Sequence, residues 1–304
     1  MALRQDTRRR EGVIFLDITN NIKLIEKEDR EYPGLLRQIS GAPDRLYCIG
    51  DISLLHTRSV AVVGTRKCSE YGRQAALKAG RLLAENRVTA VSGMAAGIDR
   101  FVHEGALENG GGTIAVLACG PDICYPRSNK VIYDRIVKNG LIISEYPPGT
   151  RPRPWQFPMR NRIISGLCLL TAVIEAGTGS GSLITAREAA EQGRDVMALP
   201  GNINSPFSLG TNKLIADGAG IITVLEDILR TAGIDPVMDR ADKTALGGDE
   251  LRLYKLLAKN GEMTVDEVCA AMQKDSFEVN GLISVMEIKG IVSFCLGKIF
   301  IAKY

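Results

Sequence analysis

The sequence predicts a doubly wound α/β fold, with helices on both faces of a parallel sheet, followed by a small second domain. Short apolar segments alternate with amphipathic segments from residue 59 to residue 231. The apolar segments are continuous, which is typical of strands covered on both faces. The chain has 304 residues, 45% of them hydrophobic, which is enough for one sizeable domain and a smaller one.

The predicted elements follow in order, a strand and then a helix. Ser59–Val63 is apolar and β-branched, and Ser69–Glu85 has its apolar positions at helical spacing. The further strands are expected at 88–91, 113–117, 141–144, 168–175, 195–198 and 221–223. The further helices are expected at 98–108, 129–138, 161–166, 182–192 and 211–217. In such a sheet, ligands bind beyond the carboxyl ends of the strands.

Four parts of the chain are predicted. Residues 1–57 form a short extension that packs on the main domain, and 58–231 form the α/β domain. Residues 232–248 form a linker, and 249–304 form three helices and a hairpin, which is a winged-helix pattern. The third of these helices has no Lys or Arg between Asp275 and Ile288. This favours a protein contact or weak auxiliary binding over duplex recognition.

Composition excludes several classes of protein. Seven scattered cysteines without a CxxC pair, and only two histidines, argue against a zinc site and a disulfide framework. We therefore expect no metal and a reducing, cytoplasmic location. No apolar run approaches the roughly 20 residues of a membrane span, and the charged residues 1–12 do not resemble a secretory signal. The net charge is only +3, so affinity for nucleic acid requires a local patch.

Such a patch lies in residues 151–162, which contain four arginines together with Trp155 and Phe157. No acidic residue lies between Glu145 and Glu175. Single-stranded nucleic acid favours this combination, because phosphates attract cations and unstacked bases need flat apolar faces. For an isolated run of this kind, a surface connector with solvated arginines is the alternative interpretation.

Small and polar residues follow six of the predicted strands. These turns are Gly64–Arg66, Ser92–Gly97, Gly120, Ser144–Glu145, Gly177–Ser182 and Pro200–Gly201. Glycines allow a ligand to approach the backbone, and N–H groups at helix starts hold phosphate oxygens. None of the turns has the G-x-G-x-x-G pattern, and residues 177–182 lack the lysine of a P-loop. We therefore expect a phosphate-backbone cradle without a nucleotide cofactor.

Four carboxylate or imidazole side chains are candidates for chemistry. Asp99 and His103 share one helix face, and we favour a structural role for them over general acid–base catalysis. Glu145 and Glu175 are the other candidates, and either of them can orient arginines of the basic stretch.

The chain resembles the DprA (Smf) family of bacterial DNA-processing proteins of natural transformation. The matches include Val62–Arg66 and Ser92–Asp99, and the most specific of them are Phe157–Arg162 and Ser180–Thr185. The resemblance implies an extended Rossmann-like domain that binds single-stranded DNA, protects incoming DNA and assists loading of the recombinase RecA. It also implies a homodimer formed through that domain, without enzymatic activity, metal or nucleotide, and a C-terminal winged-helix-type domain.

The resemblance also assigns DNA-binding residues, to which we add two from the glycine-rich turn at 177–182. The nine residues are Gly64, Thr65, Arg66, Phe157, Arg160, Asn161, Arg162, Gly181 and Ser182. In this assignment the three arginines hold phosphates. Phe157 stacks on a base, and Asn161 reads or orients one. Trp155 is a weaker stacking candidate that can equally belong to the core.

Two other functions compete with single-strand binding. The fold also resembles nucleotide phosphoribohydrolases, whose catalytic glutamate falls at Thr185 in this sequence. The second competitor is a duplex-binding regulator that acts through the winged-helix module, against which the acidic third helix argues.

Overall fold

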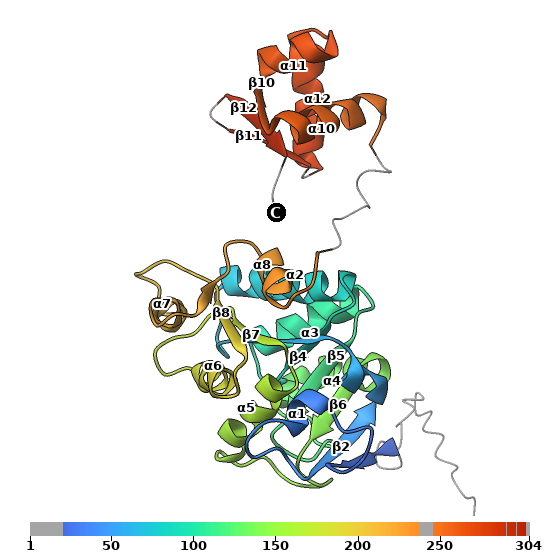
Figure 1. Cartoon of the computed structure of the whole chain (residues 1–304), viewed down its shortest axis with the longest axis vertical. Helices are drawn as coiled ribbons and strands as arrows, with labels where there is room; N and C mark the ends of the chain where they lie inside the picture. The colour runs from blue at the N-terminus through green and yellow to red at the C-terminus, as the bar shows by residue number, and fades with distance from the viewer. Residues whose placement is uncertain (1–20, 237–245, 290, 296, 302–304) are drawn as a thin grey trace, which may run out of the picture. The chain divides into compact units, whose positions relative to one another are not determined.

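The computed structural model describes residues 21–236, 246–289, 291–295 and 297–301. The chain forms two compact units that meet in sequence between residues 236 and 237. The larger unit contains a nine-stranded sheet and its helices, and the described residues of the smaller unit form three helices and a three-stranded sheet (Figure 1). None of the helices in these described ranges has the length and apolarity needed to cross a bilayer.

The nine-stranded sheet confirms the predicted doubly wound architecture. Its order is β1-β2-β6-β5-β4-β3-β7-β8-β9. The strands are β1 (Lys23–Glu26), β2 (Arg45–Gly50), β3 (Ser59–Val63), β4 (Thr89–Ser92), β5 (Thr113–Leu117), β6 (Leu141–Ser144), β7 (Leu170–Val173), β8 (Asp195–Ala198) and β9 (Gly220–Ile221). The strands from β6 to β9 in this order pair in parallel, whereas β2 pairs antiparallel with both β1 and β6. The N-terminal extension therefore adds two strands to the sheet, which the sequence interpretation did not include.

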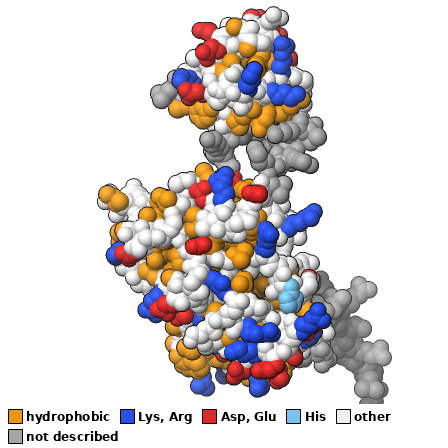
Figure 2. Space-filling view, viewed as in Figure 1, with side chains coloured by type: hydrophobic (Ala, Val, Ile, Leu, Met, Phe, Trp, Pro, Cys, Tyr) orange, Lys and Arg blue, Asp and Glu red, His pale blue; other side chains and the backbone are white. Residues whose placement is uncertain are grey.

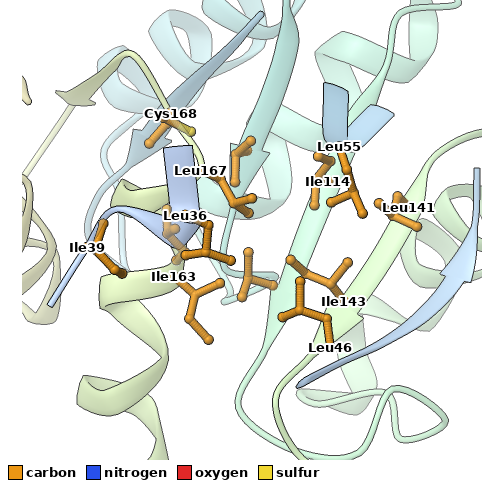
Figure 3. Close-up of a cluster of buried hydrophobic side chains, with 14 of the residues drawn as sticks. Leu36, Ile39, Leu46, Leu55, Ile114, Leu141, Ile143, Ile163, Leu167 and Cys168 are labelled. Atoms are coloured by element: carbon orange, nitrogen blue, oxygen red, sulfur yellow. The ribbon is translucent and has the colours of Figure 1, made fainter. Parts of the chain in front are cut away.

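Helices cover both faces of this sheet. They are α1 (Gly34–Arg37), α2 (Glu70–Glu85), α3 (Ile98–Glu108), α4 (Lys130–Asn139), α5 (Gln156–Gly166), α6 (Gly181–Glu191), α7 (Leu209–Ala216) and α8 (Glu226–Thr231), with 3-10 turns at Ile52–His56 and Arg127–Asn129. Alternate residues of β3 face opposite layers, as the period of a strand requires. Val60 and Val62 pack with α2, α3 and α8 on one face, while Ala61 and Val63 pack with α1 and α5 on the other. Figure 3 shows part of the second cluster, with Leu36 of α1 and Ile163 of α5 among its side chains.

Helix α5 differs most from the prediction, because it begins at Gln156 and not near Asn161. Pro158 lies in its first turn, where backbone N–H groups have no partner within the helix, so proline is tolerated there. The basic stretch is therefore partly helical. Its side chains point in different directions, and this divides the predicted arginines between different environments.

The smaller unit contains α10 (Gly248–Asn260), β10 (Glu262–Thr264), α11 (Val265–Met272), α12 (Ser276–Ile288), β11 (Val292–Cys295) and β12 (Lys298–Ile301). The core residues Leu253, Val268, Ile283 and Ile299 hold the helices on the sheet. Strand β10 pairs with β12 and adds a third strand to the predicted hairpin. Ile234, which lies near the start of the predicted linker at 232–248, is buried in the core of the larger unit. Residues 237–245 of that linker lie outside the described residues.

Candidate nucleic-acid interface

A cavity of about 590 Å³ lies at the carboxyl ends of the parallel strands. Its walls come from the turn after β3, the loops after β4 and β5, helix α5 and the start of α6. Eight of the nine predicted site residues line it: Gly64, Thr65, Arg66, Phe157, Arg160, Asn161, Gly181 and Ser182. Arg162 does not. The sheet therefore brings together residues that are more than a hundred positions apart in the sequence.

Arg66 and Phe157 form the part of the cavity that most resembles a nucleic-acid site. The exposed guanidinium of Arg66 lies over the Phe157 ring, 5.2 Å from its centroid. A cation over an aromatic face is stabilised by the ring's quadrupole. A positive charge and a flat apolar ring are therefore adjacent, as binding of a phosphate and an unstacked base requires.

The turn that presents Arg66 is fixed from both sides. The N–H of Thr65 donates to the carbonyl of Glu175 at 2.7 Å, and the Thr65 carbonyl accepts from Ile98 N–H at 3.2 Å. Gly97, with φ +80°, allows this packing, because a Cβ there would lie 2.3 Å from the Thr65 oxygen. The position of Arg66 is thus set by β7 and by the start of α3.

The environment of Arg160 differs from the phosphate-binding role that was predicted for it. Its side chain is only 5% exposed, and its guanidinium donates to the carbonyls of Gly93, at 2.6 Å, and Val116. Burial lowers its pKa to about 10 despite the nearby Asp99 carboxylate. Arg160 therefore lies in the cavity wall and crosslinks the ends of β4 and β5, and these carbonyls occupy the guanidinium that was predicted to hold a phosphate.

The environment of Arg162 also differs from its predicted phosphate-binding role. Both terminal nitrogens donate to the carboxylate of Glu145, at 2.7 and 3.0 Å, and Nε donates to the carbonyl of Gly41 at 2.8 Å. The arginine lies outside the cavity and joins α5 to the segment after β6 and to the N-terminal extension. The prediction that Glu145 orients an arginine agrees with this geometry.

Asn161 has internal partners as well. Its amide nitrogen donates to the carbonyl of Gly181 at 3.3 Å, and its amide oxygen accepts from Arg160 Nε at 3.3 Å. The side chain is buried, so it links α5 to the start of α6. This geometry favours a supporting role over direct base reading.

The start of α6 contributes backbone to the cavity wall. Ser180 caps the helix by accepting from Ser182 N–H, and a Cβ added to Gly179 or Gly181 would meet nothing within 4 Å. The open backbone and the unpaired N–H groups of a first helical turn suit an anion.

The remaining predicted carboxylate and imidazole groups have structural partners. Asp99 accepts from the N–H groups of Gly93 and Ala95, at 3.1 and 3.4 Å, and burial raises its pKa. His103 Nδ1 lies 2.7 Å from the Thr113 hydroxyl, and burial lowers its pKa to about 3. These contacts agree with the structural interpretation of the pair.

Within the described part of the chain, Glu175 orients no arginine. Its carboxylate accepts from the N–H and the hydroxyl of Ser69, the residue that caps α2. Within the described residues, no cluster of three or more His, Cys, Asp or Glu side chains suited to a metal is present.

The sequence interpretation missed Tyr125, which lines the cavity from the loop after β5. Its ring centroid lies 5.6 Å from that of Phe157. The signal was a tyrosine–proline pair after an apolar strand, but nothing local indicated that it faces Phe157. Trp155 is exposed, so it is not a core residue, and it packs edge-on against Tyr146 away from the cavity.

The fold and the cavity define an α/β protein with an arginine, aromatic rings and open backbone at the ligand-binding edge of its sheet. Residues 23–233 match the sequence profile of the family described as "DNA recombination-mediator protein A", and the chain belongs to this family. This confirms the resemblance to DprA and Smf.

Three comparisons illustrate the relationship. DNA processing protein DprA of Streptococcus pneumoniae is 47% identical over 198 residues, which cover 65% of this chain and 70% of the relative. The X-ray structure of that protein matches with a TM-score of 0.67 and 44% identity, over 70% of this chain and 75% of its own. A Helicobacter pylori DNA processing protein A, whose structure is described as showing a unique single-stranded DNA binding mode, matches with a TM-score of 0.63 and 33% identity, over 69% and 94% of the two chains.

Proposed function

We propose that this protein binds single-stranded DNA in the cavity between β3, α5 and α6. The observation on which the proposal depends is the exposed guanidinium of Arg66 over the Phe157 ring, beside the open backbone at the start of α6. The described single-strand binding of the Helicobacter pylori relative supports it.

In this proposal, three parts of the cavity contact different groups of the DNA. Arg66 exchanges its ring contact for a phosphate, and Phe157 offers its face to a base. The backbone of Gly181 and Ser182 approaches a second phosphate at the start of α6. Exposed bases are required, which favours a single strand over a duplex. The net charge is only +3, so the site relies on local contacts more than on a broad positive field. Both basic and acidic side chains occur on the face shown in Figure 2.

Fluorescence anisotropy with matched single-stranded and duplex oligonucleotides across a salt series tests the proposal. We expect the full chain to prefer the single strand, with an affinity that falls as salt increases. Arg66→Ala should reduce the salt slope by about 0.7, the value for one lost phosphate contact on a single strand. Phe157→Ala should cost about 1–3 kcal/mol of binding free energy. Equal or absent binding to the two probes would contradict the proposal.

We infer a binding protein and not an enzyme. The phosphoribohydrolase alternative requires a glutamate at the position of Thr185, and Thr185 is buried in the cavity wall. The carboxylate of Asp99, which does lie in the wall, already accepts two backbone hydrogen bonds. Release of base from a nucleoside monophosphate by the purified chain would favour the enzyme instead.

The duplex-binding alternative places recognition in the smaller unit. Helix α12 contains no Lys or Arg, and its side chains Phe277 and Ile288 are 88% and 87% exposed. An apolar, slightly acidic helix surface does not suit a phosphate backbone. We expect single-strand binding to persist largely in a chain that ends at residue 248, and loss of binding there would favour the alternative.

We further propose that the protein acts in the cytoplasm, where it protects incoming DNA and assists RecA loading as a homodimer. Exposed apolar side chains at the β9 end of the sheet support a dimer: Ile203, Leu209 and Ile221. Sedimentation equilibrium of wild type and Ile221→Asp tests the dimer. RecA filament formation on strands coated with a single-strand binding protein tests the loading step.

A further inference from the structure

Tyr125 is an aromatic residue of the cavity to which the function proposed above assigns no role. Its side chain is 44% exposed, and it lines the cavity from the loop after β5. Its ring centroid lies 5.6 Å from that of Phe157, and the two ring planes are inclined by 50°. Two aromatic rings with different orientations therefore lie side by side at the ligand-binding edge of the sheet.

The loop that presents Tyr125 is held in place from both of its ends. Tyr133 donates its hydroxyl to the carbonyl of Pro121 at 2.5 Å, and the Asn129 amide donates to the carbonyl of Met94 at 2.8 Å. Tyr133 and Asn129 are both buried. A ring on such a fixed loop loses little conformational freedom when a ligand covers it, which favours binding.

Tyr125 also has the more accessible of the two rings. Phe157 is half-buried, and the guanidinium of Arg66 covers its ring. The Tyr125 hydroxyl makes no hydrogen bond with any of residues 21–236, so it is free to contact a base edge or a phosphate.

We propose that Tyr125 is a second base-stacking residue and that the cavity takes two successive unpaired bases, one on each ring. This inference rests on the proposed function. One base is flat, so it can lie parallel to only one of two rings inclined by 50°. A single-base site would leave one of these rings without a partner, whereas two consecutive bases of a strand can occupy both.

The test compares Tyr125→Ala and Tyr125→Phe with wild type by anisotropy, using the full chain and an oligothymidylate probe. We expect the alanine variant to bind about 5- to 150-fold more weakly, with an unchanged salt slope, because a neutral ring is lost. The phenylalanine variant keeps the ring and should bind within about twofold of wild type. The control is Tyr71→Ala, because Tyr71 is 52% exposed and lies outside the cavity lining.

A second probe separates stacking from a structural effect. On an oligonucleotide of the same length that consists only of abasic sugars, the phosphates remain but no base can stack. We expect Tyr125→Ala and wild type to bind that probe equally. A variant that is merely distorted would bind both probes more weakly, and such a result would overturn the inference.

The inference and the proposed function fail in different ways. If Phe157→Ala weakens binding to oligothymidylate and Tyr125→Ala does not, the site holds a single stacked base and the inference is wrong. If wild type itself does not bind the single strand, the proposed function is wrong. If Tyr125→Phe loses as much affinity as Tyr125→Ala, the hydroxyl is the important group, and stacking by the ring is refuted.

Discussion

Replacement of Arg160 by methionine distinguishes a phosphate contact from a structural crosslink. A methionine side chain at this position would fill much of the same space without a charge or donors. The carbonyls of Gly93 and Val116 would lose their donor, and the buried carboxylate of Asp99 would lose its cationic neighbour. An unsatisfied buried polar group costs about 1–3 kcal/mol.

Two buried carbonyls lose their donor together, so we expect Arg160→Met to lower the free energy of unfolding by about 2–5 kcal/mol, a large part of a typical domain's stability. Because burial already raises the pKa of Asp99, its protonation at lower pH should reduce part of the deficit.

The assay is urea unfolding followed by circular dichroism, with the fluorescence of Trp155, the single tryptophan, reporting on the larger unit. The matched control is Arg66→Met, in which an exposed arginine of the same cavity is replaced. Its stability should change by less than about 0.5 kcal/mol, while its salt slope in single-strand binding decreases. The reasoning is refuted if Arg160→Met is as stable as wild type and shows the reduced salt slope instead.

Two further predictions concern packing and pH. Gly72→Ala should destabilise the larger unit by about 1–3 kcal/mol, although alanine favours helices, because its Cβ would lie 2.2 Å from a Glu175 carboxylate oxygen. Gly281→Ala should stabilise the smaller unit by up to about 1 kcal/mol, because the added Cβ meets nothing within 4 Å. Thermal unfolding of both variants checks that the first is less stable and the second more stable than wild type. Burial lowers the pKa of His103 to about 3, below its unfolded value near 6.5, so its contribution to stability is complete above pH 6.5 and is lost as pH falls. Between about pH 6.5 and 5, the free energy of unfolding measured with urea should fall by up to about 1.4 kcal/mol per pH unit. His103→Gln should remove this pH dependence, whereas His56→Gln should leave it. Equal pH dependence in all three proteins would contradict the prediction.

The sequence predicted the parallel strands well because most of them are local apolar runs. Ser59–Val63, for example, is wholly buried, and no residue outside it was needed to recognise it as a strand. The two strands of the N-terminal extension were missed because turn-forming residues such as Pro43 and Gly50 flank short segments with weak patterns. The pairing of β2 with β6 is a long-range contact that local patterns do not report.

The sequence predicted most residues of the candidate site, but not the directions in which their side chains point. With α5 placed too late in the sequence, Phe157 and Arg160 lay outside the predicted helix and no periodicity separated them. In the structure, Gln156, Arg160 and Ile164 share a buried face at helical spacing, so Arg160 points inward. Tyr125 was missed for a different reason, since its contact with Phe157 joins a loop and a helix far apart in the sequence.

The position of α5 has a consequence for how the cavity would bind single-stranded DNA. The same helix offers Phe157 to the cavity, anchors Arg160 under β4 and β5, and ties Arg162 to Glu145. Rotation of Phe157 with its helix would break both anchors, so in the proposed function the backbone around the cavity keeps its shape and the Arg66 side chain moves off the Phe157 ring when a strand binds. Binding should therefore be fast, with most of the loss of conformational freedom falling on the strand.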